Sequence, residues 1–322
     1  QLRPGERQGC GGRGAGMTFT GFAQLVERLQ QSKVRKRVAV VAADDAHTLE
    51  AVLLAVKDGV VTPVLIGDAA RIKACLAELG DTGATSRIVD VVDPVAAARK
   101  AVELIHAGEV DFLMKGRLET APLMKVVVDK ESNLRTGRIM SHIGFLEIPS
   151  YHKLLAITDV ALNTTPDLAQ KRQIIENAVG ALAAMGVEMP KVAVMAATEE
   201  VNPKLIESVD AAELKRLNQI GELTGCIVEG PISYDLAVDR EAVALKEYQS
   251  AVAADADLLV VPALTAGNLL IKALVYSAGA KSAGFVVGAK VPIVLVSRSS
   301  STADKHMSVA LAAAACQEVV YV

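Results

Sequence analysis

Short apolar runs alternate with stretches of helical periodicity along almost the whole chain. Most of the apolar runs lack polar alternation and are rich in Val and Ile, which is typical of strands buried on both faces. Strands are predicted at 37–43, 61–67, 87–92, 110–116, 139–147, 153–160, 191–196, 224–229, 257–262, 283–289 and 291–297. Helices are predicted at 18–31, 46–57, 68–79, 120–129, 167–185, 203–220, 241–254, 266–277 and 303–316, with one more opened by Asp93-Pro94. The pattern predicts an α/β fold with a parallel or mixed sheet covered by helices on both faces.

The composition narrows the class of protein. The 322 residues carry 34 Lys+Arg and 37 Asp+Glu, and this near balance lacks the basic excess of a nucleic-acid binder. Hydrophobic residues make up 51%, which excludes a disordered chain. The longest apolar stretch, 258–276, contains Asn268 and Lys272, so no membrane span is expected.

The cysteines and the first residues bear on the compartment. Four scattered cysteines without a CxxC pattern suit neither a zinc site nor a disulfide framework, and the expected location is a reducing cytoplasm. Residues 1–16 contain no apolar segment of a signal peptide. They are expected to be a non-native or disordered tail before Met17.

The segment 291–306 carries the strongest local signal. An apolar strand ends in Ser297-Arg298, hydroxyl residues follow, and then a helix starts. Backbone N–H groups at a helix start, hydroxyls and a guanidinium together favour an anion. The alternative is structural, because Ser301 and Asp304 match the spacing of a capping box. Both interpretations remain open at this point.

Weaker candidates follow other predicted strands, where ligands of open α/β sheets collect. Each of them combines a cation or a polar side chain with a glycine turn, and each also suits an ordinary solvated turn. They are Lys115 and Gly116; Arg135, Arg138 and Ser141; Gly230 and Pro231; and Gly267, Asn268 and Lys272. No P-loop, HExxH, EF-hand or GxSxG motif is present, and no metal site is expected.

Taken together, these pieces resemble the phosphate acetyltransferase/phosphate butyryltransferase family. The matching segments are LMKG (113–116), LRTGRIMSH (134–142), EGPISYDLA (229–237), ADLLVVPALTAGN (256–268) and LVYSAGAKSAGFVVGAKVPIVLVSRSS (274–300), followed by Asp304. The long block from AGN (266–268) to Ser297-Arg298 is the specific part. Two segments lean toward the butyryltransferase branch, and SYDLA is closer to the acetyltransferases. The acyl preference between butyryl and acetyl therefore stays open.

The resemblance implies a reaction and roles for residues. The reaction is acyl-CoA + phosphate = acyl phosphate + CoA, with coenzyme A as a substrate and without a tightly bound cofactor. The resemblance assigns Asp304 as general base toward the CoA thiol, and Ser297 and Arg298 as stabilisers of the tetrahedral oxyanion. The weaker candidates above would bind phosphate or CoA.

The resemblance also implies an architecture. Two α/β domains resemble the isocitrate/isopropylmalate dehydrogenase-like fold, with 17–147 plus 288–322 as the first domain and 148–287 as an inserted second domain. The cleft between them would bring Ser297, Arg298 and Asp304 toward Asn268 and Gly230. A homodimer or a higher homo-oligomer is expected, with no nucleic-acid or membrane partner.

Two other classes of protein remain as alternatives. A metal-dependent dehydrogenase of similar two-domain architecture would need clustered Asp or His ligands, and a chelator would abolish its activity. A non-catalytic acyl-CoA- or solute-binding protein would bind its ligand without turnover.

Overall fold

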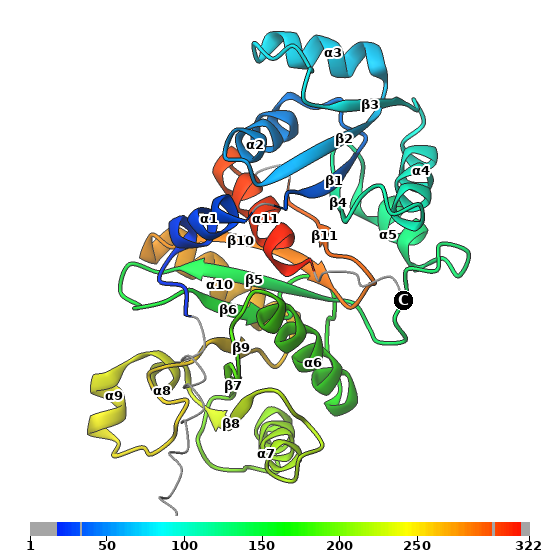
Figure 1. The fold of residues 1–322 in the computed structure, drawn as a ribbon. Coiled ribbons are helices and arrows are strands. Elements are labelled where there is room, and N and C mark those ends of the chain that lie inside the picture. The colour runs from blue at the N-terminus through cyan, green and yellow to red at the C-terminus, as the bar shows by residue number, and fades with distance from the viewer. Residues whose placement is uncertain (1–17, 33, 298–299, 317–322) are drawn as a thin grey trace, which may run out of the picture.

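The computed structural model describes residues 18–32, 34–297 and 300–316. Within these residues one mixed sheet of 11 strands runs through the molecule in the order β3-β2-β1-β4-β11-β10-β5-β6-β9-β7-β8 (Figure 1). The strands are β1 (Lys36–Val41), β2 (Val61–Gly67), β3 (Arg87–Asp90), β4 (Phe112–Lys115), β5 (Ser141–Glu147), β6 (Leu155–Thr158), β7 (Lys191–Met195), β8 (Ile227–Ile232), β9 (Leu258–Val260), β10 (Lys281–Val287) and β11 (Ile293–Val294).

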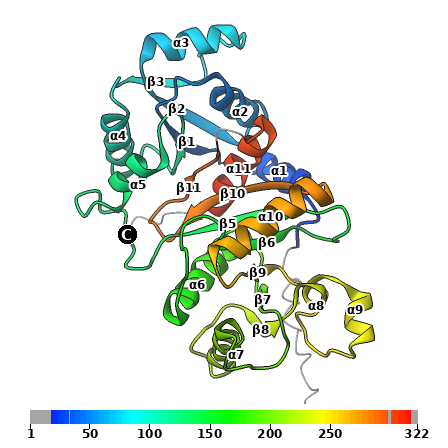
Figure 2. The same ribbon diagram turned by 180° about the vertical axis from the view of Figure 1, so that it is seen from behind.

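Helices cover both faces of this sheet. They are α1 (Phe22–Gln31), α2 (Ala46–Lys57), α3 (Ala69–Glu78), α4 (Pro94–His106), α5 (Thr120–Val128), α6 (Leu168–Ala184), α7 (Ile206–Gln219), α8 (Tyr234–Val238), α9 (Arg240–Leu245), α10 (Leu264–Ala278) and α11 (Thr302–Ala315). One continuous core lies under α1, α2, α3, α6, α7 and α11. The opposite face, seen in Figure 2, has one core under α4 and α5 and another under α8 and α10.

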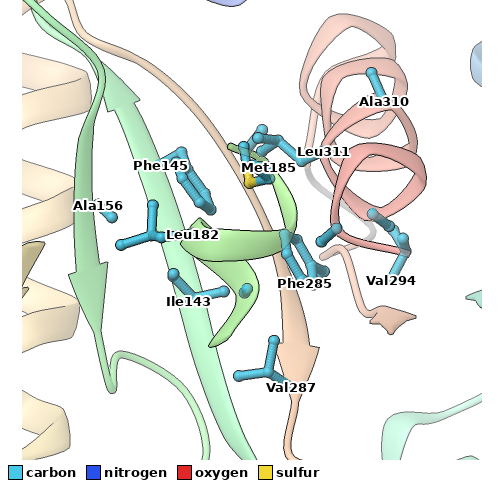
Figure 3. Packing of buried hydrophobic residues seen from close by; sticks show 14 of the residues in the cluster. Ile143, Phe145, Ala156, Leu182, Met185, Phe285, Val287, Val294, Ala310 and Leu311 are labelled. Carbon is cyan, nitrogen blue, oxygen red and sulfur yellow. The ribbon is translucent and has the colours of Figure 1, made fainter. Parts of the chain in front are cut away.

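The centre of the large core shows why so few aromatic residues suffice. Phe145 on β5 and Phe285 on β10 stack with ring centroids 6.2 Å apart, and Figure 3 shows Leu182 and Leu311 beside them. Around these rings the buried side chains are mostly Ala, Val, Leu and Ile. Small and branched side chains fill the space between the sheet and α11 at close packing.

The direction of the strands divides the sheet into two halves. β1, β4 and β11 run parallel to one another, while β10 is antiparallel to both β11 and β5. β5 is in turn antiparallel to β6, and β6, β9, β7 and β8 are parallel. The carboxyl ends of the β6–β8 half therefore point to the edge opposite the carboxyl ends of β1, β4 and β11.

Most elements predicted from the sequence are present, and their limits usually agree within three residues. The strand 61–67 and the helix 46–57 coincide with β2 and α2. Capping explains this precision for several helices, because Asp45, Asp68, Asp93 and Asp167 each accept a backbone N–H at a helix start.

The predicted helix 241–254 is wrong beyond Leu245. The chain instead forms the short α8 and α9, and α9 ends at Leu245. Glu247 has φ of +49°, a left-handed conformation that no α-helix continues. Tyr248 and Val252 beyond it pack into the core under α8 and α10, so tertiary contacts override the helical period. The predicted strand 291–297 also pairs only over Ile293–Val294.

The α/β class with a mixed sheet is confirmed. The division into two domains stays a prediction, and one strand bears on it directly. β10, which the predicted boundary assigns to the inserted domain, lies between β11 and β5 of the first domain. The predicted tail 1–16 lies outside the described residues. No helix within the described part of the chain is long and apolar enough to cross a membrane.

Candidate functional site

Three neighbouring parallel strands end together and gather several of the predicted residues. β1, β4 and β11 lie side by side, and their carboxyl ends lead into 42–45, 115–118 and 295–297. The helix α11 starts a few residues after β11. We call this region the β1–β4–β11 edge. It is the position at which open α/β sheets usually bind ligands.

Ser297 and Asp304 both lie at this edge. Ser297 is exposed after β11, and its carbonyl accepts a hydrogen bond from the Ser300 N–H at 3.1 Å. The capping box predicted for the helix start is present: the Ser301 Oγ accepts from the Asp304 N–H at 3.1 Å, and the Asp304 Oδ2 accepts from the Ser301 N–H at 3.2 Å. Arg298, the predicted oxyanion partner, lies outside the described residues.

A buried serine holds the first turn of α11 against the centre of the sheet. The Ser308 hydroxyl donates to the Asp304 carbonyl at 2.7 Å and accepts from the Gly284 N–H of β10 at 3.1 Å. The position of Asp304 is thus fixed by its own cap and by this link to β10.

Lys115 and Gly116 close the end of β4, and their geometry revises the predicted roles. The Lys115 ammonium is buried and donates to the carbonyls of Gly116 at 3.3 Å and Leu118 at 3.1 Å, so it also stabilises its own loop. The Gly116 N–H donates to the Val41 carbonyl at 2.8 Å. A Cβ on Gly116 would lie 2.3 Å from the Ala42 carbonyl oxygen. Gly116 is therefore required for the close approach of two backbones.

Replacing Gly116 by Ala should separate the ends of β1 and β4. The obstacle is backbone, which cannot swing aside, so we expect a loss of about 1–3 kcal/mol in the free energy of unfolding and a large loss of turnover. Thermal unfolding and initial rates measure both. Gly180→Ala on α6 is the control, because its Cβ would meet no atom within 4 Å and alanine favours a helix. Equal melting temperatures of the two variants would contradict this role of Gly116.

The structure adds two charged residues that sequence reasoning missed, Asp44 and Arg71, and places them beside Arg117 of the predicted strand end. Asp44 follows β1, and its Oδ2 lies 3.3 Å from an Arg71 nitrogen and 3.5 Å from an Arg117 nitrogen. Arg117 directly follows the predicted Lys115-Gly116 pair, and its backbone N–H donates to the Ala42 carbonyl at 2.7 Å. The available signal was the strand order: β1 and β4 are neighbours, so polar residues after both strands meet.

Asp45 connects this edge to α11. Burial tends to raise the pKa of its carboxyl, but hydrogen bonds from the Thr48 side chain and N–H and the nearby charge of Lys305 outweigh burial, and the net pKa is lowered. Lys305 is buried in the first turn of α11, directly after Asp304. The edge therefore combines carboxylates with three basic side chains, Arg71, Arg117 and Lys305, beside the hydroxyls of the segment that follows β11.

Arg135, Arg138 and Ser141 lie elsewhere, at the opposite edge of the sheet. Ser141 begins β5 and pairs with Val287, and its hydroxyl is fully buried against the Asn177 amide at 3.3 Å. Arg135 bridges Ala289, and Arg138 lies 3.9 Å from Glu176 of α6. Because β5 and β11 run in the same direction, the start of β5 and the end of β11 lie at opposite edges.

The predicted residues of the second half are also kept apart from Ser297 by the sheet. Gly230 and Pro231 lie inside β8, where a Cβ on Gly230 would meet Val194 at 2.9 Å. β8 is six strand positions from β11, roughly 29 Å at the usual strand spacing. The sheet therefore does not bring Gly230 to the β1–β4–β11 edge, and its close packing explains the glycine.

Gly267 and Asn268 fix the start of α10. A Cβ on Gly267 would lie 2.7 Å from Val261 and 2.9 Å from Val160, and the Asn268 amide donates to the Val160 carbonyl at 3.5 Å. These contacts are at the carboxyl ends of β6 and β9, at the edge opposite Ser297. Lys272, one turn later, is exposed on α10.

The fold and this edge define an α/β protein with hydroxyl, carboxylate and basic side chains at the ends of parallel strands. Comparison with known proteins makes the class specific. The family model for phosphate acetyl/butaryl transferase matches residues 77–313, and the chain belongs to this family.

Individual members of the family are similar to this chain over nearly their whole lengths. The phosphate acetyltransferase of Thermotoga maritima is 44% identical over 86% of this chain and 94% of its own. The phosphate butyryltransferase of Clostridium acetobutylicum is 39% identical over 91% of this chain and 97% of its own. The crystal structure of a branched-chain phosphotransacylase from Enterococcus faecalis covers 88% of this chain and 100% of its own, with 34% identity and a TM-score of 0.78.

Proposed function

We propose that the chain is a phosphate acyltransferase and transfers a short acyl group between CoA and phosphate at the β1–β4–β11 edge. Membership of the family supports the reaction. The observation that supports the location is the convergence of Ser297, Asp304 and the Lys115–Arg117 turn on one sheet edge. CoA enters as a substrate, the protein needs no tightly bound cofactor, and it works in the cytoplasm.

Asp304 supplies the general base in this proposal. In the direction of acyl-CoA synthesis, the CoA thiol transfers its proton to the Asp304 carboxylate and the sulfur attacks the carbonyl carbon of the acyl phosphate. The carbon–oxygen bond to phosphate then breaks, and phosphate leaves. Only Oδ2 of Asp304 has a hydrogen bond within the described residues, to the Ser301 N–H, which leaves Oδ1 available for a proton.

The tetrahedral intermediate needs fixed donors for its oxyanion. Ser297 follows β11 and precedes α11 in the chain, and we propose its hydroxyl for this role together with Arg298. Arg117 and Arg71 are added here as candidates for the phosphate, because they are exposed at the same edge with Asp44 between them. Such exposed pairs with a carboxylate are weak and can open toward an anion.

A thiol-release assay tests the reaction. Acetyl-, propionyl- and butyryl-CoA are offered with and without phosphate, in the presence of a chelator. We expect thiol release to require phosphate and to be unaffected by the chelator. The initial rates with the three acyl-CoA substrates will show which acyl chain is preferred. Thiol release at the same rate without phosphate would indicate a thioesterase. A loss of activity in the presence of chelator would favour the metal-dependent dehydrogenase. The sequence and its relatives leave acetyl and butyryl open, and one methylene changes binding by only about 1–3 kcal/mol.

The two-domain, isocitrate/isopropylmalate dehydrogenase-like arrangement is retained as part of this proposal. The residues 148–154 and 288–292 are its connections. Lys153, inside the first connection, is buried and donates to the Asp257 carboxylate at 2.6 Å.

The outer face of α10 supports the expected homodimer. Of its 15 residues only Gly267 is buried, while Leu269 and Tyr276 are 64% and 83% exposed. Together with Ala266 and Ala273 they form an apolar stripe at helical spacing, the α10 stripe. A second copy of the chain, with its own α10 stripe, is the proposed partner of this surface.

Leu269→Glu should convert the dimer to a monomer, because it places a charge in the centre of the α10 stripe. Light scattering coupled to size exclusion measures the mass. Leu245→Glu on α9 is the matched control, since Leu245 is 78% exposed and lies outside the stripe. A mass unchanged by Leu269→Glu, or an equal change with Leu245→Glu, would exclude this interface.

A further inference from the structure

A cavity of about 890 Å³ opens at the edge of the sheet opposite the β1–β4–β11 edge. Lys36 at the start of β1, Asp111 before β4 and Pro292 before β11 line it, so the same three strands begin at this cavity and end at the proposed acyl-transfer site. Lys115 lies four residues after Asp111, roughly 13 Å along β4. The cavity is therefore separate from the site already described.

The lining carries more positive than negative charge. Its four cationic side chains are Lys36, Arg37, Arg138 and Lys290, and its two carboxylates are Asp111 and Glu176. The Asp111 carboxylate is already neutralised by Arg37, with Nη2 to Oδ1 at 2.7 Å and Nε to Oδ2 at 3.1 Å. Glu176 lies 3.0 Å from Arg172 as well as 3.9 Å from Arg138.

Two lysines remain with unbalanced charge. Within the described residues Lys36 makes no ion pair; the nearby Asp111 carboxylate, on which its charge acts, is already paired with Arg37. The Lys290 ammonium donates to a neutral partner, the Asn133 side-chain oxygen, at 3.2 Å. Burial raises the pKa of Cys316 to about 12, so this thiol adds no negative charge to the cavity. An anion would balance the two ammonium groups.

Part of the cavity lining is apolar. Val287, Val291 and Pro292, here called the apolar floor, line the cavity and keep a small exposed surface, whereas the neighbouring Phe285 is fully buried. A volume of this size, with an apolar floor and a few charged groups at the rim, is typical of sites for small organic ligands. Its shape is held by Gly288, whose φ is +92° and whose Cβ would lie 2.4 Å from the Ile139 carbonyl oxygen.

We propose that this cavity binds a phosphorylated small molecule of nucleotide size, with its phosphates between Lys36 and Lys290 and its flat or apolar body against Val287, Val291 and Pro292. The cavity would be a second ligand site of the acyltransferase. The proposal for this cavity concerns ligand binding only. Experiments can therefore reject it without affecting the proposed acyl transfer, and they can reject acyl transfer without affecting it.

Calorimetric titration of the full chain with ADP, in the presence of saturating CoA, tests the proposal. We expect ADP to bind, and Lys36→Gln and Lys290→Gln each to weaken this binding by about tenfold. Inorganic phosphate alone should bind more weakly than ADP, because it leaves the apolar floor uncovered. Lys204→Gln, a change of an exposed lysine before α7, is the matched control and should leave the affinity unchanged.

Three results would overturn the proposal. They are the absence of ADP binding to the wild-type chain, competition between ADP and CoA for one site, and equal affinities in the wild type, Lys36→Gln and Lys290→Gln. Thiol release without ADP, measured on the same variants, should equal that of the wild type. If the lysine variants released thiol more slowly than the wild type but bound ADP with unchanged affinity, both lysines would act in the transfer reaction. This result would also overturn the proposed ADP site.

Discussion

Asp304→Asn is expected to lower the turnover number by about 10²–10⁴, the usual contribution of a general base. The side-chain oxygen of asparagine can still accept from the Ser301 N–H, as the Asp304 Oδ2 does at 3.2 Å. It cannot accept the proton of the CoA thiol at neutral pH. The melting temperature should therefore stay close to that of the wild type while phosphate-dependent thiol release collapses.

Ser301→Ala separates the cap from the chemistry. This variant removes the Oγ that accepts from the Asp304 N–H and leaves the carboxylate in place. We expect it to cost about 0.5–2 kcal/mol of stability, as losses of N-cap residues usually do, with a much smaller effect on turnover. If Asp304→Asn turned over normally and Asp304→Ala melted early, Asp304 would be a cap and the base would have to be another group.

Lys171→Met is expected to cost about 3–5 kcal/mol in the free energy of unfolding, the largest effect on stability that we predict. The Lys171 ammonium on α6 lies 2.6 Å from the Asp210 carboxylate on α7, and both residues are buried. Removing the cation leaves a buried carboxylate without its partner. The melting temperature should fall by roughly 4–7 °C for a chain of this length.

The double variant Lys171→Met/Asp210→Leu tests the cause. It removes both charges, so most of the lost stability should return. Lys100→Met is the control on an exposed pair, because Lys100 and Glu103 lie 2.7 Å apart at the surface of α4 and should contribute less than about 1 kcal/mol. A loss in Lys171→Met no larger than that in Lys100→Met would show that the buried pair does not hold α6 to α7.

The candidate site was predictable where neighbouring segments of sequence form it. Ser297, Ser301 and Asp304 lie within eight residues, and the spacing of Ser301 and Asp304 alone predicted the capping box that the structure contains. Lys115 and Gly116 were found as a strand end, although Gly116 is explained by its contact with Ala42 rather than by a ligand. Asp44 and Arg71 were missed, because only the sheet order, in which β1 lies between β2 and β4, brings them to this edge.

The predicted site residues that do not lie at the β1–β4–β11 edge are kept away from it for one reason, the direction of the strands. The carboxyl ends of strands meet at a common edge of the sheet only where the strands run in the same direction. The antiparallel neighbours of β5 and β10 reverse the second half of the sheet, so Asn268 follows a carboxyl end at the edge opposite Ser297. Arg138 belongs to the cavity at that opposite edge.

The sequence by itself determined the class of fold, the limits of most elements and the family, because periodicity, capping residues and specific motifs are local properties of a chain. The tertiary structure alone decided the strand order and directions, the reversal between the halves of the sheet, and the end of α9 before Tyr248. These features depend on contacts between residues far apart in the sequence, whose burial outweighs local preference. Such contacts cannot be read from any one segment.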